Sequence, residues 1–429
     1  MELFQHQRDL IAQSPLKHGL WWECGTGKTL TTIKLAEKNA NTVLIVCPKS
    51  LKENWAREIE KWVEYPHKGA RNVGAYEVSN WIKQLHEHFK IVSKEEFRRD
   101  WEDLSLAKYE GLIIDEAHFF SGHKSQMFKT AQKYIKAVQP KCIYLATATP
   151  FLSSPFNIYC YEVLLGYKAK WQDYRRKYFN EIRMGNRIIP QVKKDAKYAL
   201  AKTLNKIGST VKKEDCLDLP DQVYLREDFK LNSDQRKHIR LLESSPLVTS
   251  HIVLYTKRHQ IAGGTLRMPE ASKSDPALVF KSEKLTRVLE LAEEHPKLII
   301  VCRYNAELDL IASKLKKPYV LLNGSVPGDE RQKRLDYANS QDEMVFLVNA
   351  ACSEGWNAIS FNTLVFYSNG FSYKDRVQME GRIHRIGQIN RCTYIDLVMT
   401  DDIDEDILRS LKNKQDFDLA RYATQHQST

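Results

Sequence analysis

A short glycine-bearing loop near the N-terminal end constrains the fold of this chain more than any other stretch. Residues 23–29 read ECGTGKT, and a helical pattern follows them from Leu30 to Lys38. Gly25 and Gly27 let backbone N–H groups close around phosphate oxygens, where a Cβ atom would clash. The loop is therefore predicted to hold a nucleotide phosphate, with the positive dipole end of the following helix directed at it.

The other residues of the loop have distinct predicted roles. Lys28 supplies a point charge to the outer phosphates, the Thr29 hydroxyl completes a Mg²⁺ shell, and Thr26 lies between the two glycines of the cradle. The strict pattern has a glycine where this chain has Trp22, which leaves open a glycine-rich turn with an incidental lysine. Gln7 is predicted to read an adenine edge through its amide, unless it is an ordinary surface residue.

Length and charge bound the organisation of the chain. At 429 residues, two domains with separate cores are expected. Between Lys168 and Lys213 the chain has 14 Lys or Arg and 3 Asp or Glu, a surplus equal to the net charge of +11 of the whole chain. This basic segment indicates a polyanionic partner, with a solvated helical face as the alternative.

The distribution of cysteines and of apolar runs argues against a secreted or membrane-spanning protein. The eight cysteines are scattered without a Cys-x-x-Cys pair, and several lie in apolar runs, so reduced core residues of an intracellular protein are expected. The start of the chain has no basic segment followed by an apolar one, so no secretory signal is predicted. No apolar run approaches the length of a membrane span.

The first 150 residues alternate short apolar runs with helical stretches. The runs at 42–48, 111–115 and 142–146 are typical of strands buried on both faces. Strands that alternate with helices predict a parallel sheet with right-handed crossovers, and ligands gather at the carboxyl ends of such strands. The polar residues that follow these runs are therefore expected to lie at one edge of the sheet.

The rest of the chain predicts a helical, basic segment and then a second α/β unit. The expected domains are a first lobe at 1–150, a basic insertion and linker packed on that lobe at 151–220, and a second lobe at 221–429 that ends in a closing helix. The second lobe is marked by four further apolar runs, at 298–302, 319–322, 344–348 and 363–367. Because it has no second phosphate loop, one nucleotide is expected in the cleft between the lobes.

Two adjacent acids follow the second predicted strand. Asp115 is placed to hold Mg²⁺, and Glu116 is placed to orient and activate the attacking water. Paired acids at the end of a buried strand are costly unless a cation or substrate uses them, although an acidic helix start is the alternative. His118, Thr147 and Thr149 are predicted to couple these acids to the facing lobe.

Residues 378–388, QMEGRIHRIGQ, are the counterpart in the second half of the chain. Arg382 and Arg385 are three residues apart and on a helix would share a face. Two guanidinium groups directed into a cleft can stabilise charge on a transferred phosphoryl group, an effect worth roughly 10³–10⁵ in rate. A basic surface helix is the alternative for this stretch considered by itself.

With these motifs in order, the chain resembles a superfamily 2 helicase ATPase of the Swi/Snf-like branch, a branch in which the leading glycine of motif I is also often missing. The loop at 23–29 resembles motif I, residues 115–118 (DEAH) the DEAH box, and residues 378–388 motif VI. Further stretches carry the resemblance: 44–51 with Asn54, Trp55 and Glu58 (motif Ia), 146–150 (the Ser-Ala-Thr motif), 281–285 (the lead into motif IV), 323–325 with Arg331 (the motif after it) and 351–357 (motif V). Cys352 and Ser353 stand where motif V usually has glycines.

The resemblance implies an α/β fold of two RecA-like lobes, each a parallel sheet flanked by helices, with a small helical insertion between them. It implies ATP and Mg²⁺ as cofactors, with the arginines meeting the phosphates when the lobes close. Gly355 and Gln378 join the nucleotide-binding residues by motif position. The nucleic-acid contacts that it implies are Lys49, Ser50, Ser93, Ser325 and Arg331.

The function that the resemblance implies is a DNA-dependent ATPase that translocates on DNA or remodels it, as a monomeric motor. Duplex or branched DNA is the expected partner, with RNA left open and no membrane. A strand-separating or branch-migrating helicase remains an alternative, as does an ATP-switched binding protein without processive motion; a P-loop kinase fits least. The short insertion resembles the minimal motor cores of phage and bacterial members, so the cytoplasm of such a host is the expected location.

Overall fold

The computed structural model describes most of the chain. The described residues are 3–63, 88–150, 156–167, 170–184, 187–193, 196–216, 219–245, 248, 250–268, 276–353, 356–400, 402–413 and 416–417. They form two compact units, residues 1–218 and 219–429, and each unit is built around its own sheet.

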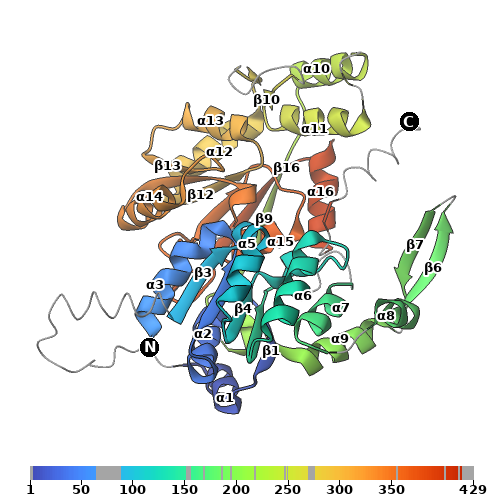
Figure 1. The fold of residues 1–429 in the computed structure, drawn as a ribbon. Coiled ribbons are helices and arrows are strands. Elements are labelled where there is room, and N and C mark those ends of the chain that lie inside the picture. The colour runs from blue at the N-terminus through green and yellow to red at the C-terminus, as the bar shows by residue number, and fades with distance from the viewer. Residues whose placement is uncertain are drawn as a thin grey trace, which may run out of the picture. The chain divides into compact units, whose positions relative to one another are not determined.

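The first unit contains a six-stranded parallel sheet in the order β3-β2-β4-β5-β1-β8 (Figure 1). Its strands are β1 (Lys17–Trp22), β2 (Val43–Cys47), β3 (Phe89–Ser93), β4 (Gly111–Asp115), β5 (Cys142–Ala146) and β8 (Gly208–Val211). Strands β2 and β5 are buried along their whole length, as expected for short β-branched and apolar runs covered on both faces. Because all six strands are parallel, their carboxyl ends lie at one edge of the sheet.

Helices cover both faces of this sheet. Alternate residues of β2 divide between two cores: Val43 and Ile45 pack with α1, α2 and α3, and Leu44 and Val46 pack with α5, α6, α7 and α9. The helices are α1 (Gln5–Gln13), α2 (Lys28–Asn39), α3 (Lys52–Trp62), α5 (Lys94–Leu106), α6 (Gln126–Val138), α7 (Phe156–Leu164), α8 (Trp171–Tyr178) and α9 (Ala196–Ile207), with short 3₁₀ turns η1 (Lys49–Leu51), η2 (Ala117–Phe120) and η3 (Lys213–Asp215).

The insertion is not purely helical, so the helical pattern expected for it is wrong in part. An antiparallel hairpin of β6 (Phe179–Met184) and β7 (Arg187–Val192) extends beyond α8 (Figure 1), and β8 joins the main sheet beside β1. The sequence signal for the hairpin is the Gly185-Asn186 dipeptide between two runs with β-branched residues. The sequence of β8 carries no such local signal. This strand forms through its pairing with β1, a contact between residues far apart in the chain.

The second unit contains another six-stranded parallel sheet, in the order β13-β14-β12-β15-β16-β9. Its strands are β9 (Gln222–Phe229), β12 (Lys297–Cys302), β13 (Tyr319–Leu322), β14 (Met344–Asn349), β15 (Thr363–Phe366) and β16 (Cys392–Met399), and its helices are α10 (Ser233–Glu243), α11 (His251–Ala262), α12 (Glu283–Glu294), α13 (Asn305–Ala312), α14 (Gly328–Ser340), α15 (Tyr373–Glu380) and α16 (Ile403–Lys412). A small hairpin of β10 (Thr265–Leu266) and β11 (Leu278–Val279) and the 3₁₀ turn η4 (Ala350–Cys352) complete it.

Both faces of the second sheet are also covered. Along β12, Leu298 and Ile300 pack with α12 and α13, whereas Ile299 and Val301 pack with α14 and the end of α15. The predicted architecture, two parallel sheets each flanked by helices, is therefore confirmed. No helix among the described residues is both long enough and apolar enough to cross a membrane.

Candidate nucleotide-binding site

The phosphate loop connects the carboxyl end of β1 to the first turn of α2. Gly25 and Gly27 both adopt left-handed backbone conformations, with φ of 85° and 87°. A Cβ atom at Gly27 would lie 2.3 Å from Gln7 Nε2, so this position requires glycine on steric as well as conformational grounds. The first turn of α2 contains no acidic residue, which leaves its positive end available to an anion.

Gln7 braces this loop from α1. Its amide donates hydrogen bonds to the carbonyl oxygen of Gly27 and to Thr31 Oγ1, both at 3.1 Å, and its Oε1 accepts one from the Phe4 N–H. The side chain is buried, and His6 Nε2 lies 2.9 Å from the carbonyl oxygen of Thr26. Gln7 therefore lies against the phosphate loop, and its predicted contact with an adenine edge stays a prediction.

Lys28 is directed back over the loop. Its ammonium group donates hydrogen bonds to the carbonyl oxygens of Trp22 and Glu23, at 2.9 and 3.0 Å. It also lies close enough to Asp115 to oppose the rise in the pKa of that carboxyl. Thr26 is fully buried, and its hydroxyl donates to the carbonyl oxygen of Glu23, which closes the loop on itself.

The two predicted acids lie at the carboxyl end of β4. Asp115 accepts hydrogen bonds from the Trp55 indole N–H at 2.8 Å and from the Glu116 backbone N–H at 2.9 Å. Burial raises the pKa of the Asp115 carboxyl to about 7, and the charge of Glu116 acts in the same direction. A cation beside Asp115 would relieve this cost, and a carboxylate oxygen is a ligand that Mg²⁺ prefers, so the residue fits the predicted metal role.

Glu116 has an unusual backbone conformation and a specific partner. Its φ is 49°, a left-handed value that carries a conformational cost for a residue other than glycine. His118 Nδ1 lies 3.1 Å from Glu116 Oε2 and 3.1 Å from Thr147 Oγ1, and Thr147 Oγ1 in turn accepts a hydrogen bond from the Thr149 N–H. The fold thus brings the predicted acid and the three predicted coupling residues into one buried relay at the ends of β4 and β5.

The predicted nucleic-acid contacts of the first unit lie at the ends of β2 and β3. Lys49 is exposed and Ser50 is half-buried in η1, directly after β2. Ser93 pairs in register with Cys47, but it is buried and its hydroxyl accepts the Glu96 N–H as the N-cap of α5. The fold brings these three residues to one edge, while their contact with nucleic acid remains a prediction.

In the second unit, Ser325 and Arg331 belong to one turn. Ser325 is exposed, and both its N–H and its hydroxyl donate to Asn323 Oδ1. Arg331 folds back from α14 and donates to the carbonyl oxygens of Val326 and Asn323. Gly355 lies outside the described residues.

The placement of Arg382 and Arg385 on a helix is wrong. Helix α15 ends at Glu380, and the arginines follow it in a series of turns. Polar contacts that a continuing helix would not allow stabilise these turns. Gln388 Nε2 donates a hydrogen bond to the carbonyl oxygen of Phe361, and His384 Nε2 lies 3.0 Å from the carbonyl oxygen of Pro220. Arg382 donates to the carbonyl oxygen of Trp356 at 2.8 Å.

Gln378 connects this segment to motif V. Its Oε1 lies 3.1 Å from the hydroxyl of Ser353, which also lies 3.2 Å from Asp375 Oδ1. Both Ser353 and Gln378 are buried. A serine at this position of motif V therefore supplies a polar contact to α15 that glycine could not make.

The structural roles of two residues escaped the sequence reasoning, although Trp55 itself was part of the motif Ia resemblance. Trp55 orients Asp115, and a tryptophan buried beside acids needs a partner for its N–H, which is the signal that could have found it. Arg376 joins α15 to β16 through an ion pair to Asp396 at 2.5 Å, and it also pairs with Glu380 of its own helix at 2.6 Å. A buried arginine requires such partners, but the sequence does not indicate which acids they are.

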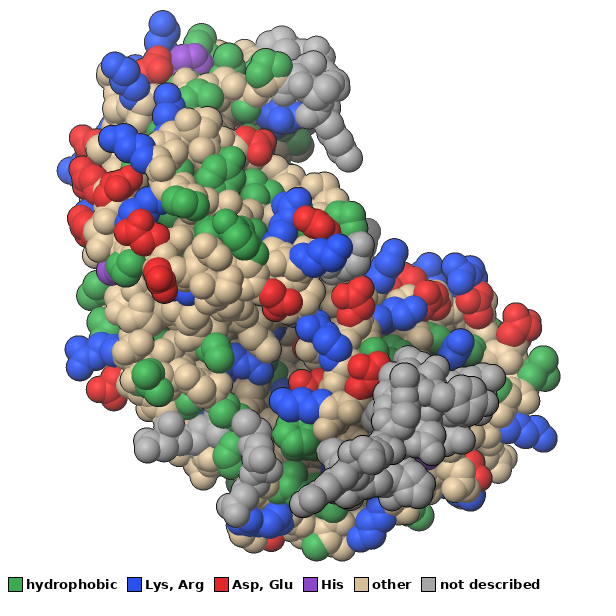
Figure 2. All heavy atoms as spheres, turned by 90° about the vertical axis from the view of Figure 1, so that its left-hand side faces the viewer, with side chains coloured by type: hydrophobic (Ala, Val, Ile, Leu, Met, Phe, Trp, Pro, Cys, Tyr) green, Lys and Arg blue, Asp and Glu red, His purple; other side chains and the backbone are tan. Residues whose placement is uncertain are grey.

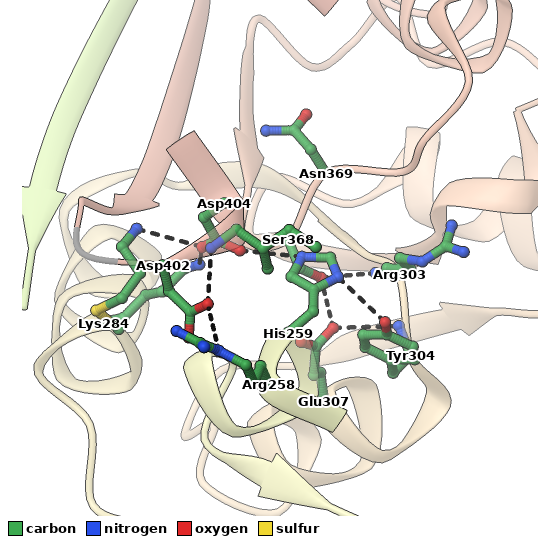
Figure 3. A network of polar contacts seen from close by, with 12 residues as sticks. Arg258, His259, Lys284, Arg303, Tyr304, Glu307, Ser368, Asn369, Asp402 and Asp404 are labelled. Atoms are coloured by element: carbon green, nitrogen blue, oxygen red, sulfur yellow. Dashed lines mark hydrogen bonds and ion pairs between the residues drawn. The ribbon is translucent and has the colours of Figure 1, made fainter. Parts of the chain in front are cut away.

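A buried polar cluster includes Tyr304, which follows the carboxyl end of β12 closely (Figure 3). Lys284 and His259 contact the two oxygens of Asp404, at 2.6 and 3.0 Å. His259 Nδ1 lies 3.1 Å from the Tyr304 hydroxyl, and Glu307 accepts hydrogen bonds from the Tyr304 N–H and the Ser368 hydroxyl. The cluster joins α11, α12, α13 and α16 behind the sheet edge, with the Arg303 guanidinium pointing away from it (Figure 3).

Comparison with known proteins agrees with the order of these motifs. Residues 19–266 match the model of the SNF2-related domain, and residues 281–387 match that of the helicase conserved C-terminal domain. The CHD3-type chromatin-remodeling factor CHR7 of Arabidopsis thaliana is 23% identical over 432 residues, covering 91% of this chain and 34% of the relative. Human chromodomain-helicase-DNA-binding protein 1 is 23% identical over 436 residues, covering 92% of this chain and 25% of the relative.

Among solved structures, the Sulfolobus solfataricus SWI2/SNF2 ATPase core in complex with dsDNA is 19% identical, with a TM-score of 0.44, covering 96% of this chain and 91% of the other. The chain spans about a quarter to a third of the length of the curated relatives quoted above. Because the first family model matches more than half of the chain and the predicted resemblance is thereby confirmed, this chain belongs to the SNF2-related domain family.

Proposed function

We propose that this chain is a nucleic-acid-dependent ATPase that couples ATP hydrolysis to translocation on DNA or to its remodelling. The observation that carries the proposal is the edge of the first sheet, where Lys28, Asp115 and Glu116 converge with the relay through His118. A cationic group beside two glycines in left-handed conformations suits a phosphate, and a pair of half-buried acids suits a metal ion and a polarised water. Family membership supports the same chemistry.

The proposed roles follow the chemistry of each side chain. The N–H groups from Gly25 to Thr29 and the Lys28 ammonium bind the phosphates of ATP, and Thr29 and Asp115 hold Mg²⁺. The metal, when bound, neutralises charge on the phosphate oxygens. Glu116 orients the attacking water and accepts its proton, and His118 fixes the position of the Glu116 carboxylate.

The second lobe completes the proposed site. Arg382 and Arg385 stabilise the charge that develops on the transferred phosphoryl group, and Gln378 and Gly355 bind on the same side of the nucleotide. Since these groups belong to a different unit from Lys28, hydrolysis requires the lobes to close. The need for lobe closure is what would couple ATP hydrolysis to movement along DNA.

DNA is the proposed partner. One similar structure contains an ATPase core with dsDNA, and the quoted relatives are named as chromatin-remodelling or DNA-binding proteins. The proposed contacts to the phosphates are Lys49, Ser50, Ser93, Ser325 and Arg331, and phosphate contacts carry no base sequence. Tracking would then be independent of base sequence. The proposed setting is the cytoplasm of a bacterium or a phage-infected host, with the motor acting as a monomer.

An ATPase assay across nucleic acids tests the proposal. Hydrolysis by the purified chain is measured without nucleic acid and with single-stranded, duplex, forked and four-way DNA, with RNA alongside. We expect duplex or branched DNA to stimulate turnover, and steep loss of stimulation as salt rises. Absence of stimulation by every nucleic acid would refute the proposal. A strand-displacement assay on the forked substrate, with a triplex-displacement control, separates unwinding from translocation.

A further inference from the structure

Helix α8 presents cationic side chains on a firmly anchored support. Its aromatic residues face the first core: Tyr174 and Tyr178 are buried, and Trp171 stacks on His123 at 3.7 Å between ring centroids. Their spacing of three and four residues places them on one side of the helix. The opposite side carries exposed Lys170, Arg176 and Lys177, beside the single acid Asp173.

Helix α9 adds a second row of cations. Lys202 and Lys206 are exposed and one turn apart, and Tyr198, one turn further back, is 81% exposed. The helix is held to the sheet because Trp21 Nε1 donates to the carbonyl oxygen of Leu204 at 3.0 Å.

The two rows meet on one surface. The Tyr178 hydroxyl of α8 lies 3.5 Å from Thr203 Oγ1 of α9, so the two helices lie side by side. In agreement with this contact, burial raises the pKa of Glu162 in α7, and the charges of Lys177 and Lys206 both act to lower it. Lys193, which follows β7, donates to the carbonyl oxygen of Arg176.

The charge of this surface is strongly one-sided. Among described side chains from 170 to 206, seven are basic (170, 175, 176, 177, 193, 202 and 206) and one is acidic. Glu162 of α7, near Lys177 and Lys206, adds a second acid to this surface. On the face shown in Figure 2, by contrast, acidic and basic side chains lie intermixed.

We infer that this basic face of α8 and α9 binds the phosphate backbone of duplex DNA, in addition to the residues at the helicase motifs. The inference rests on the proposed function, because a motor that moves on DNA is what brings a polyanion to this surface. Exposed cations in such density release counterions when they meet phosphates, which makes binding favourable and salt-dependent. The surface therefore sets affinity rather than sequence preference.

Charge reversal with a matched control tests the inference. Lys202→Glu/Lys206→Glu changes the charge of this face, and Lys129→Glu/Lys136→Glu makes the same change on exposed lysines of α6. Binding of a short fluorescein-labelled duplex to the full chain is measured by anisotropy between roughly 50 and 200 mM salt. We expect the α9 pair to lose at least about tenfold in affinity and to reduce the salt slope by about 2, and the α6 pair to lose less than about threefold.

The outcomes separate this inference from the proposed function. If the unmodified chain binds duplex and is stimulated by it while the two pairs behave alike, the inference is overturned and the proposed function stands. If the unmodified chain neither binds nor responds to any nucleic acid, both fall. Thermal unfolding checks that each variant is folded. If the charge-reversed variant is not folded, the same binding measurement is made with Lys202→Ala/Lys206→Ala.

Discussion

The indole N–H of Trp55 donates a 2.8 Å hydrogen bond to Oδ2 of Asp115. Trp55 is 1% exposed, so the bond is shielded from water, and the other oxygen of Asp115 is fixed by the Glu116 N–H. The carboxylate is thus held in one orientation before any metal arrives. Such orientation is what a residue that holds Mg²⁺ through one or two oxygens requires.

Replacing Trp55 by phenylalanine should weaken the proposed magnesium site. Trp55→Phe removes the N–H and keeps an aromatic ring, and a hydrogen bond to a charged group contributes about 1.5–3 kcal/mol. We expect the Mg²⁺ concentration needed for binding of a fluorescent ATP analogue to rise about tenfold. Trp62→Phe is the matched control, because Trp62 of the same helix donates to the Glu58 carboxylate at 2.6 Å. Equal Mg²⁺ dependence in the two variants would contradict the role of Trp55.

Glu116→Gln should separate ATP binding from hydrolysis. The amide keeps the size of the side chain but cannot accept a proton, and positioned general bases contribute roughly 10²–10⁴ in rate. We expect turnover to fall by that factor with ATP binding retained, whereas Lys28→Ala should lose hydrolysis and weaken binding. Glu110→Gln, beside the opposite end of β4, should change neither. Near-normal turnover in Glu116→Gln, measured by phosphate release, would remove this residue from the mechanism.

Lys284→Met should destabilise the second unit strongly. Lys284 is fully buried and 2.6 Å from Asp404, so within the described part of the chain its removal leaves a buried carboxylate whose remaining side-chain contact is His259. Breaking a buried ion pair from one side costs about 3–5 kcal/mol. Arg409→Met, which breaks the exposed pair with Asp406, should cost less than about 1 kcal/mol. Denaturant unfolding measures both, and similar losses would show that burial does not govern the contribution of the Lys284 pair.

Glu307→Gln should change the pH dependence of stability. Burial raises the pKa of Glu307 above its ordinary value, since the charged form is disfavoured in the folded state. A carboxyl of this kind contributes stability that is complete below its unfolded pKa of about 4.3 and is lost as pH rises through its folded pKa, by about 1.4 kcal/mol per unit of difference. The variant does not titrate, so its unfolding free energy relative to the unmodified chain should increase as the pH rises above the unfolded pKa of about 4.3.

A flat difference across that pH range would show that Glu307 ionises equally easily in both states. Chemical unfolding of the two proteins at each pH is the measurement. Asp404 provides the contrasting case: burial acts to raise its pKa, but Lys284 and His259 outweigh this and lower it. The stability that Asp404 contributes is therefore present above its unfolded pKa and is lost in acid.

The sequence predicted the central strands of the sheets well. The apolar runs at 111–115 and 142–146 became β4 and β5, because a short β-branched run flanked by helical patterns has few other ways to be buried. The position of Asp115 and Glu116 at a strand end followed from that strand, and the parallel topology then brought Thr147 to the same edge. Edge strands such as β8 were missed because their residues are only partly buried and carry a weak pattern.

The sequence by itself determined the chemical groups of this protein and their order: a phosphate loop, two acids, a pair of arginines and two sets of buried strands. Tertiary structure alone decided that Trp55 orients Asp115, that Gln7 lies against Gly27, and that the segment of Arg382 turns away from a helix. The physical reason is that local pattern fixes which face of an element is buried, whereas the partner of a buried polar group is chosen by contacts between residues far apart in the chain.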